Sequence, residues 1–203
     1  MYKDSDLPEI VFATHNPNKS LEVAAMLSGI YKVKNLNDIN IVDEIPETGS
    51  TIEENSRIKV RYLHEKAGIN CFADDSGLEV EALNGEPGVH SARYSGEPKD
   101  DVRNVDLLLK NLAGISNRKG QFRTVVTLIL DGIEKQFEGI VTGTIIDEKR
   151  GSAGFGYDPI FIPDGYNLTF AEMSTEEKNT ISHRGKAVRA LVEYLKNSFS
   201  PDE

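Results

Sequence analysis

The sequence predicts one mixed α/β domain with room for two lobes. Two observations favour this fold class. An apolar run at residues 9–14 leads through a tight loop into a helix start, which is how an α/β unit begins. Two long β-rich segments, 123–130 and 135–146, follow later in the chain. The 203 residues suffice for one well-buried core and are few for two, and no internal repeat or low-complexity linker divides them.

The first strand and the first helix meet at a polar loop. Residues 9–14 form the strand, and Asn16 and Pro17 suit the N-cap and the first helical position, where a missing N–H costs nothing. Gly29 suits the C-terminal end of this helix. A short strand is expected next, at residues 31–36.

The following segment is first acidic and then helical. Residues 37–50 form an acidic loop, and residues 51–54 have the Thr-x-x-Glu pattern of a capping box. The helix that starts there runs to about Lys66 and stops at Gly68. Residues 69–73 form a buried strand that leads into an Asp-Asp-Ser-Gly sequence.

The second half contains a hairpin between two loop-rich segments. A Gly- and Pro-rich loop at 83–98 is long enough to be functional or disordered, and a helix is expected at 101–112. An Asp-Gly dipeptide separates the strands 123–130 and 135–146, which is a strong hairpin signal.

The last part begins with another Gly- and Pro-rich stretch, at 151–165. Residues 174–177 are a second capping-box candidate, and residues 186–196 have the periodicity of an amphipathic helix.

Composition excludes several classes of protein. A formal net charge of −10 is poorly suited to a long nucleic-acid duplex. No apolar run approaches the ~18 residues of a membrane span, and the polar N-terminus lacks the features of a secretory signal. The single cysteine, Cys71, excludes an internal disulfide and a cysteine cluster for zinc. A cytoplasmic protein without nucleic-acid or membrane partners is expected.

The first candidate site is the loop Thr-His-Asn-Pro-Asn-Lys at residues 14–19. Backbone N–H groups at a helix N-terminus and the helix dipole favour an anion there. Thr14 adds a hydroxyl and Lys19 a full positive charge, so the loop suits a phosphate group, although it lacks the glycine-rich run of a Walker P-loop. The alternative is an ordinary capped helix with a solvated lysine.

The second candidate site is the acid pair Asp74 and Asp75. Two adjacent carboxylates favour a cation such as Mg²⁺, and one of them could orient or deprotonate a water. Because neighbours in an extended segment point to opposite faces, only one of them would face a cleft. Glu47, in the acidic segment upstream, is the best single candidate for a further metal ligand. The alternative is that Asp-Asp-Ser-Gly forms a turn.

Two further segments have ligand-binding chemistry. Residues 154–158, Gly-Phe-Gly-Tyr-Asp, combine close backbone approach, aromatic faces and an acceptor, which suits a nucleobase. Lys178 and residues 182–186 form the one basic window of an acidic protein, and Arg184 could make paired hydrogen bonds to a planar acceptor. The alternatives are a tight turn with core aromatics and a solvated helix face. The four segments together predict a Mg²⁺-dependent nucleotide-processing site.

Five sequence motifs occur in an order that identifies a family resemblance. They lie at residues 13–19, 73–78, 87–94, 154–159 and 182–185. Together they resemble the inosine triphosphate pyrophosphatase family, also called dITP/XTP pyrophosphatases. The resemblance covers nearly the whole chain and implies a pyrophosphatase domain at 9–197, with an N-terminal extension at 1–8 and a C-terminal tail at 198–203.

The resemblance implies a Mg²⁺-dependent enzyme that hydrolyses ITP, dITP and XTP to the monophosphate and pyrophosphate. Such a protein would be a homodimer that clears deaminated purines. An elongated mixed sheet flanked by helices is implied, with a substrate cleft between two lobes. Asp75 would be the general base and a Mg²⁺ ligand, and Glu47 a further ligand whose placement varies in the family. The implied substrate-binding residues are Thr14, His15, Asn16, Pro17, Asn18, Lys19, Ser76, Phe155, Gly156, Tyr157, Asp158, Lys178, His183 and Arg184.

Two other functions fit parts of the pattern. A Maf-type pyrophosphatase would act on pyrimidine or modified nucleotides, but the motifs at 154–158 and 182–185 argue against it. A regulatory module would bind a nucleotide or a metal without turnover. A panel of nucleotide substrates separates all three functions.

Overall fold

The computed structural model describes residues 7–198 of the chain. Its strands are β1 Glu9–Phe12, β2 Lys32–Asn35, β3 Cys71–Val80, β4 Lys119–Leu130, β5 Ile133–Ile145 and β6 Phe161–Pro163. Its α-helices are α1 Pro17–Leu27, α2 Ile52–Ala67, α3 Asp101–Asn111, α4 Thr175–Ile181 and α5 His183–Ser198.

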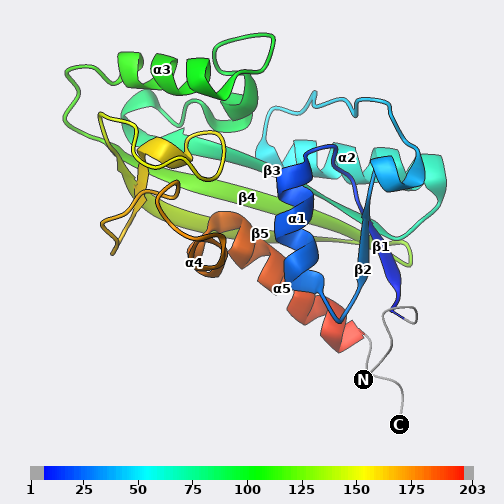
Figure 1. The fold of residues 1–203 in the computed structure, drawn as a ribbon. Helices are drawn as coiled ribbons and strands as arrows, with labels where there is room; N and C mark the ends of the chain where they lie inside the picture. Colours follow the sequence, from blue (N-terminus) through cyan, green and yellow to red (C-terminus); the bar gives the residue numbers. More distant parts are fainter. Residues whose placement is uncertain (1–6, 199–203) are drawn as a thin grey trace. The chain divides into compact units, whose positions relative to one another are not determined.

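The strands form one six-stranded sheet in the order β2-β1-β3-β4-β5-β6 (Figure 1). β1 pairs in parallel with β2 and β3, whereas β5 and β6 are antiparallel. The expected α/β domain with a mixed sheet and helices is therefore confirmed. The described residues divide into two compact units, which fits the expected two lobes. Unit 1 contains 7–75, Val125–Glu138 and 185–198, and unit 2 contains Ser76–Thr124 and Gly139–Arg184.

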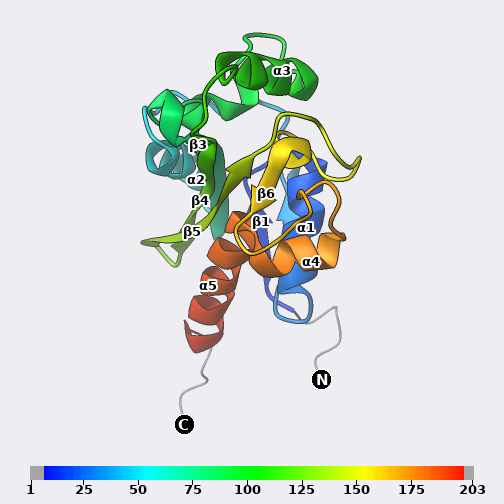
Figure 2. The ribbon, with the colours of Figure 1, turned by 90° about the vertical axis from the view of Figure 1, so that its left-hand side faces the viewer.

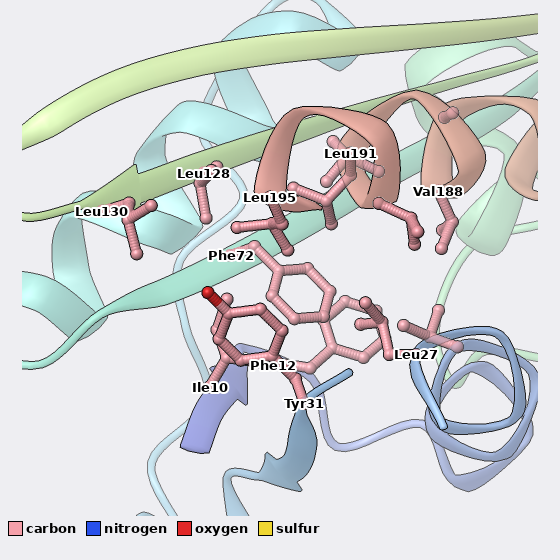
Figure 3. Close-up of a cluster of buried hydrophobic side chains, with 14 residues drawn as sticks. Ile10, Phe12, Leu27, Tyr31, Phe72, Leu128, Leu130, Val188, Leu191 and Leu195 are labelled. Carbon is pink, nitrogen blue, oxygen red and sulfur yellow. The ribbon is translucent and has the colours of Figure 1, made fainter. Parts of the chain in front are cut away.

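Unit 1 carries helices on both faces of its strands, because side chains alternate along a strand. Ile10, Phe12 and Phe72 belong to a buried cluster with side chains of α1 and α5. Val11 and Cys71 point the other way and pack with side chains of α2. The rings of Phe12 and Phe72 stack with their centroids 4.7 Å apart, beside the leucines of α5 (Figure 3).

Unit 2 has a hydrophobic core of its own, to which β3, β4, β5, α3 and β6 contribute buried side chains. Figure 2 shows the ribbons of these elements. Leu78 of β3 and Leu108 of α3 are fully buried in it. Phe122 of β4 and Phe161 meet edge to face, with their ring centroids 4.7 Å apart. This core holds the loop that follows β5.

The local signals predict the helix starts and the hairpin well. Asn16 caps α1, the Thr51 side chain accepts a hydrogen bond from the backbone of Glu54, and α4 has a complete capping box. Asp131 and Gly132 have φ values of 50° and 80°, as a primed hairpin turn requires.

Four expectations about secondary structure need correction. β3 does not end before the acid pair, because it continues to Val80, whose side chain and that of Leu78 are buried in unit 2. β4 starts at Lys119, β6 lies inside the stretch expected to be a loop, and α5 starts at His183.

The two ends of the chain fall partly outside the described residues. Residues 1–6 of the expected extension and 199–203 of the expected tail lie outside the described residues. In the described part of the chain, no helix has the length and apolarity needed to cross a bilayer. The domain bounds stay a prediction.

Candidate functional site

The acid pair lies within a continuous strand, and its two carboxylates point to opposite faces of the sheet. Asp74 bonds to Lys19 of α1, with 2.9 Å between Oδ1 and Nζ. Asp75 bonds to Lys59 of α2, with 3.0 Å between Oδ1 and Nζ. A turn at Asp-Asp-Ser-Gly is therefore wrong. The pleat gives each acid a separate environment and a lysine from the helix on its own face.

Lys59 bridges two carboxylates. Its Nζ lies 3.0 Å from Glu47 Oε1 and 3.0 Å from Asp75 Oδ1. Burial raises the pKa of Asp75, and the neighbouring Glu47 adds to this, while Lys59 and Lys19 oppose it without cancelling it. Burial disfavours the charged form of Lys59, but Asp75, Glu47 and Asp74 outweigh that cost and raise its pKa. Asp75 is thus a buried carboxyl that gains a proton more readily than an ordinary aspartate.

The N-terminal turns of α2 hold this acid site in place. Gly49 N donates to Asn55 Oδ1 at 2.8 Å, which ties the segment that carries Glu47 to the helix. A side chain at Gly49 would lie 2.7 Å from Glu54 Cβ, so this close approach requires glycine. Ser56 Oγ donates to Ala73 O at 3.1 Å, just before the acid pair. One helix therefore positions Glu47 and Asp75 relative to each other.

The donor chemistry of Glu47 and Asp75 fits a hard cation such as Mg²⁺. Both accept hydrogen bonds from the ammonium group of Lys59 through a carboxylate oxygen. The second oxygen of Asp75, Oδ2, is buried and accepts no hydrogen bond. Among residues 7–198, no set of three or more His, Cys, Asp or Glu side chains could hold a metal ion. Mg²⁺ often keeps several waters and takes one or two carboxylates plus substrate phosphates, so two carboxylates match that pattern.

The loop before α1 has part of the expected anion-binding geometry. Asn16 Oδ1 accepts from the backbone N–H groups of Asn18 and Lys19, at 3.0 and 3.2 Å. Thr14 Oγ1 accepts from Asn16 N at 3.1 Å. The cap therefore occupies two of the N–H groups at this helix start, and the Lys19 ammonium is held by Asp74 rather than solvated.

The remaining loop residues differ in exposure. Pro17 and Asn18 are exposed. The His15 ring is also exposed and lies between Asn37 and Asp43, with its nitrogens 3.3 Å from Asn37 Oδ1 and 3.0 Å from Asp43 O. His15 thus links the loop at 14–19 to the acidic segment that leads to Glu47.

In unit 2, Asp158 organises the Gly-Phe-Gly-Tyr-Asp loop. Its Oδ2 accepts from Phe155 N at 2.9 Å and from Lys178 Nζ at 2.8 Å. Gly154 has a φ of +76°, and a Cβ there would lie 2.0 Å from Asp158 Oδ2. Gly156 N donates to Asp101 Oδ2 at 2.8 Å. Both glycines and the aspartate therefore serve one tightly held loop.

The aromatic residues of this loop have separate roles. The half-buried Phe155 ring has two cations near it, Lys178 Nζ at 4.9 Å and Arg184 Cζ at 5.5 Å from its centroid. Tyr157 is buried in the core, and its hydroxyl donates to Ser91 O at 2.9 Å. Burial raises the pKa of Tyr157 well above the usual range. Only Phe155 therefore keeps part of its ring outside the core.

Most of the expected basic window is buried rather than solvated, although Lys186 is exposed. Lys178, His183 and Arg184 are each at most 5% exposed. The His183 ring stacks on Phe122 of β4, with 4.7 Å between centroids and 11° between planes. Arg184 donates to Ser76 Oγ at 3.4 Å.

Several residues that were not predicted from the sequence contact the predicted set, among them Lys59, Phe122, Thr124 and Asp101. Thr124 Oγ1 lies 2.6 Å from Ser76 Oγ. One signal existed for Lys59, since it shares a helix stripe with the buried residues Ile52, Val60 and Leu63. A lysine on an apolar stripe needs a buried counter-charge.

Comparison with known proteins adds independent findings. The model of the Ham1 family matches residues 10–194. A dITP/XTP pyrophosphatase from Flavobacterium psychrophilum is 52% identical over 189 residues, which are 93% of this chain and 100% of that protein. The Staphylococcus aureus Ham1 protein matches with a TM-score of 0.86 and 41% identity, over 94% of this chain and 99% of that one. A HAM1 protein from Coxiella burnetii matches with a TM-score of 0.87 and 38% identity, over 94% and 100%.

Proposed function

The chain belongs to the Ham1 family, and we propose that it hydrolyses dITP, ITP and XTP to the nucleoside monophosphate and pyrophosphate. The substrate class comes from relatives named dITP/XTP pyrophosphatase. The single observation that carries the chemistry is Asp75, a buried carboxyl with a raised pKa and one oxygen that accepts no hydrogen bond. Perturbed carboxyls of this kind are candidates for acid–base catalysis.

In the proposed reaction, Asp75 takes a proton from the attacking water. Cleavage between the α and β phosphates needs a positioned water, a base and neutralised phosphate charge. Asp75 Oδ2 is the atom that would receive the proton, because this buried oxygen accepts no hydrogen bond. The raised pKa makes the carboxylate a stronger base than a solvated aspartate.

Magnesium is part of this proposal, held by Glu47 and Asp75. Once bound, it would supply charge neutralisation on the polyphosphate. The lysines on the two faces of β3, Lys19 and Lys59, would add positive charge for the phosphates. Thr14, His15, Asn16, Pro17, Asn18 and Lys19 form the proposed triphosphate loop.

For the base, we assign recognition to residues of unit 2. Phe155, Gly156, Tyr157 and Asp158 would frame the purine, with Tyr157 and Asp158 acting by shaping the loop. Ser76, Lys178, His183 and Arg184 complete the proposed set. Hypoxanthine and xanthine carry a 6-oxo acceptor that His183 or Arg184 could read, whereas adenine presents a donor there. A mismatch of that kind discriminates by about 10⁴-fold in favourable cases.

The homodimeric state and the cytoplasmic location also belong to the proposal. The first follows from the family resemblance and the second from the composition. Sedimentation equilibrium of the purified chain tests the first. Immunofluorescence or fractionation of the source cells tests the second.

The decisive experiment is a substrate panel. The purified chain is incubated with Mg²⁺ and ITP, XTP, GTP or ATP, and pyrophosphate and orthophosphate are assayed separately. We expect pyrophosphate from ITP and XTP, and little from ATP, which presents a 6-amino donor. We also expect little from GTP, whose 6-oxo group matches and whose rejection must come from its 2-amino group. Orthophosphate would indicate a different phosphohydrolase, and equal hydrolysis of ATP would refute the 6-oxo argument. Nucleotide binding without any product would favour the regulatory module.

A further inference from the structure

At the proposed metal site, the ammonium group of Lys59 already bonds to both carboxylates, Glu47 and Asp75. We propose that Lys59 is a built-in counter-ion that competes with a divalent cation for Glu47 and Asp75. The nucleotide-free protein then binds such a cation weakly. This inference rests on the proposed function only in taking these two carboxylates as the metal ligands.

Lys59 contacts both of the proposed metal ligands. Its ammonium lies 3.0 Å from Glu47 Oε1 and 3.0 Å from Asp75 Oδ1, so one cation serves both acids. The three side chains are 8%, 26% and 11% exposed for Lys59, Glu47 and Asp75 respectively. A bridge this far removed from water is screened little by solvent or salt.

The charge of Lys59 reduces the negative charge that Glu47 and Asp75 offer to a metal ion. Two carboxylates and one ammonium leave a single net negative charge, whereas a divalent cation would find two if Lys59 were neutral. A cation at these oxygens would also stand beside the ammonium, and like charges repel strongly where little water screens them. The acid pair therefore has reduced affinity for metal while Lys59 holds it.

The helix that carries Lys59 is fixed in place, so only the side chain of Lys59 can move. Lys59 is on the buried stripe of α2, and Ser56 and Asn55 of the same helix bind Ala73 O and Gly49 N. The helix cannot turn the lysine away without breaking these contacts. The side chain itself has to swing, and the phosphate oxygens of an incoming nucleotide are anions that would draw it from the acids.

The test measures Mn²⁺ binding to the nucleotide-free protein by isothermal titration calorimetry, without any turnover assay. Lys59→Met removes the charge and keeps an unbranched chain of similar length. We expect it to bind Mn²⁺ at least ~10-fold more tightly than the wild type, equivalent to ~1.4 kcal/mol. The matched control is Lys19→Met, which removes the lysine of the other face and should change Mn²⁺ affinity far less.

A double variant locates the gained site. Lys59→Met combined with Glu47→Gln should return the affinity to the wild-type level, because one of the two carboxylates is gone. Unchanged or weaker Mn²⁺ binding by Lys59→Met would overturn the proposal, as would a double variant that keeps the gain. If circular dichroism shows that Lys59→Met is unfolded, Lys59→Gln is measured against the same criterion.

The result is independent of the proposed reaction. If Lys59→Met gains Mn²⁺ affinity while the wild type hydrolyses no nucleotide, the counter-ion is supported and the pyrophosphatase activity is refuted. If the wild type hydrolyses ITP but Lys59→Met gains no affinity, the activity is supported and the counter-ion is refuted.

Discussion

Among residues 7–198, two lysine–aspartate pairs have both partners buried, Lys59–Asp75 and Lys178–Asp158, and they differ in what surrounds the carboxylate. Asp158 in unit 2 binds Lys178 and the backbone N–H of Phe155 through the same oxygen, and Gly154 makes room for it. Asp75 in unit 1 shares Lys59 with Glu47, and its Oδ2 accepts no hydrogen bond.

The difference shows that the same kind of ion pair can serve two different purposes. The carboxylate of Asp158 fixes the conformation of its loop, because it accepts a hydrogen bond from a backbone N–H as well as from Lys178. A buried carboxylate with an unused oxygen and a shared cation has a raised pKa and keeps a proton-accepting atom. The first arrangement stabilises structure, and the second preserves reactivity.

The sharpest way to break this comparison is Asp75→Asn. We expect kcat to fall by ~10²- to 10⁴-fold, the range that a general base contributes. The fold should survive, because Lys59 keeps Glu47 as its partner. Pyrophosphate release from ITP and thermal melting are measured on the same preparation. Near-normal turnover would remove Asp75 as the base.

The wild-type pH profile extends this prediction. Asp75 acts as a base only when deprotonated, and its pKa is raised above the ordinary 3.8. The acid limb of kcat/KM should therefore lie at a higher pH than a solvated aspartate would give, with activity lost as pH falls through it. A limb at or below pH 3.8 would contradict the assignment.

Asp158→Asn tests the structural pair. Removing the carboxylate leaves a buried ammonium, Lys178, without it, and breaking such a pair typically costs ~3–5 kcal/mol. Urea unfolding should show that loss, in contrast to Asp75→Asn. Equal stability of the two variants would refute the division between a structural and a reactive pair.

The sequence predicts those features of the site that depend on residues close together in the chain. Alternation along a strand correctly placed Asp74 and Asp75 on opposite faces, and cap chemistry located the starts of α1, α2 and α4. These features depend on neighbours a few residues away, so a single sequence contains the information.

The partners of these acids depend on tertiary packing. α2 contains other basic residues besides Lys59, and only the docking of the helix on β3 selects the one that meets Asp75. The strand also continues past the acid pair because Leu78 and Val80 are buried in unit 2, which overrides the turn propensity of Asp-Ser-Gly. The stack of His183 on Phe122 joins residues far apart in the sequence in the same way.

A smaller effect is expected where α2 grips β3. Ala73 O can only accept, so it takes the single hydroxyl proton of Ser56. Thr127 therefore donates to Ser56 Oγ, while it accepts from Gln136 Nε2. Ser56→Ala removes the bond that Ala73 O accepts and the acceptor of the Thr127 hydroxyl, at a cost of ~1–3 kcal/mol in unfolding free energy. kcat should fall much less than in Asp75→Asn. Thr127→Val keeps the bond to Ala73 O and is the matched control.

The smallest effect is expected on the outer side of α2, at Glu134. Burial alone would raise its pKa, but hydrogen bonds from Arg61 and Arg57 outweigh burial and lower the pKa. A lowered folded-state pKa means that the carboxylate stabilises the fold above its unfolded pKa, and that this contribution is lost as pH falls through the folded value. Glu134→Gln should therefore reduce the unfolding free energy by less than about 1 kcal/mol near pH 7, because the pair is partly exposed. In urea titrations the gap between variant and wild type should close in acid, while turnover of ITP at neutral pH stays unchanged. A gap that widens in acid would mean that Glu134 is stabilised in its protonated form, and that the two arginines do not hold α2 as an ion pair.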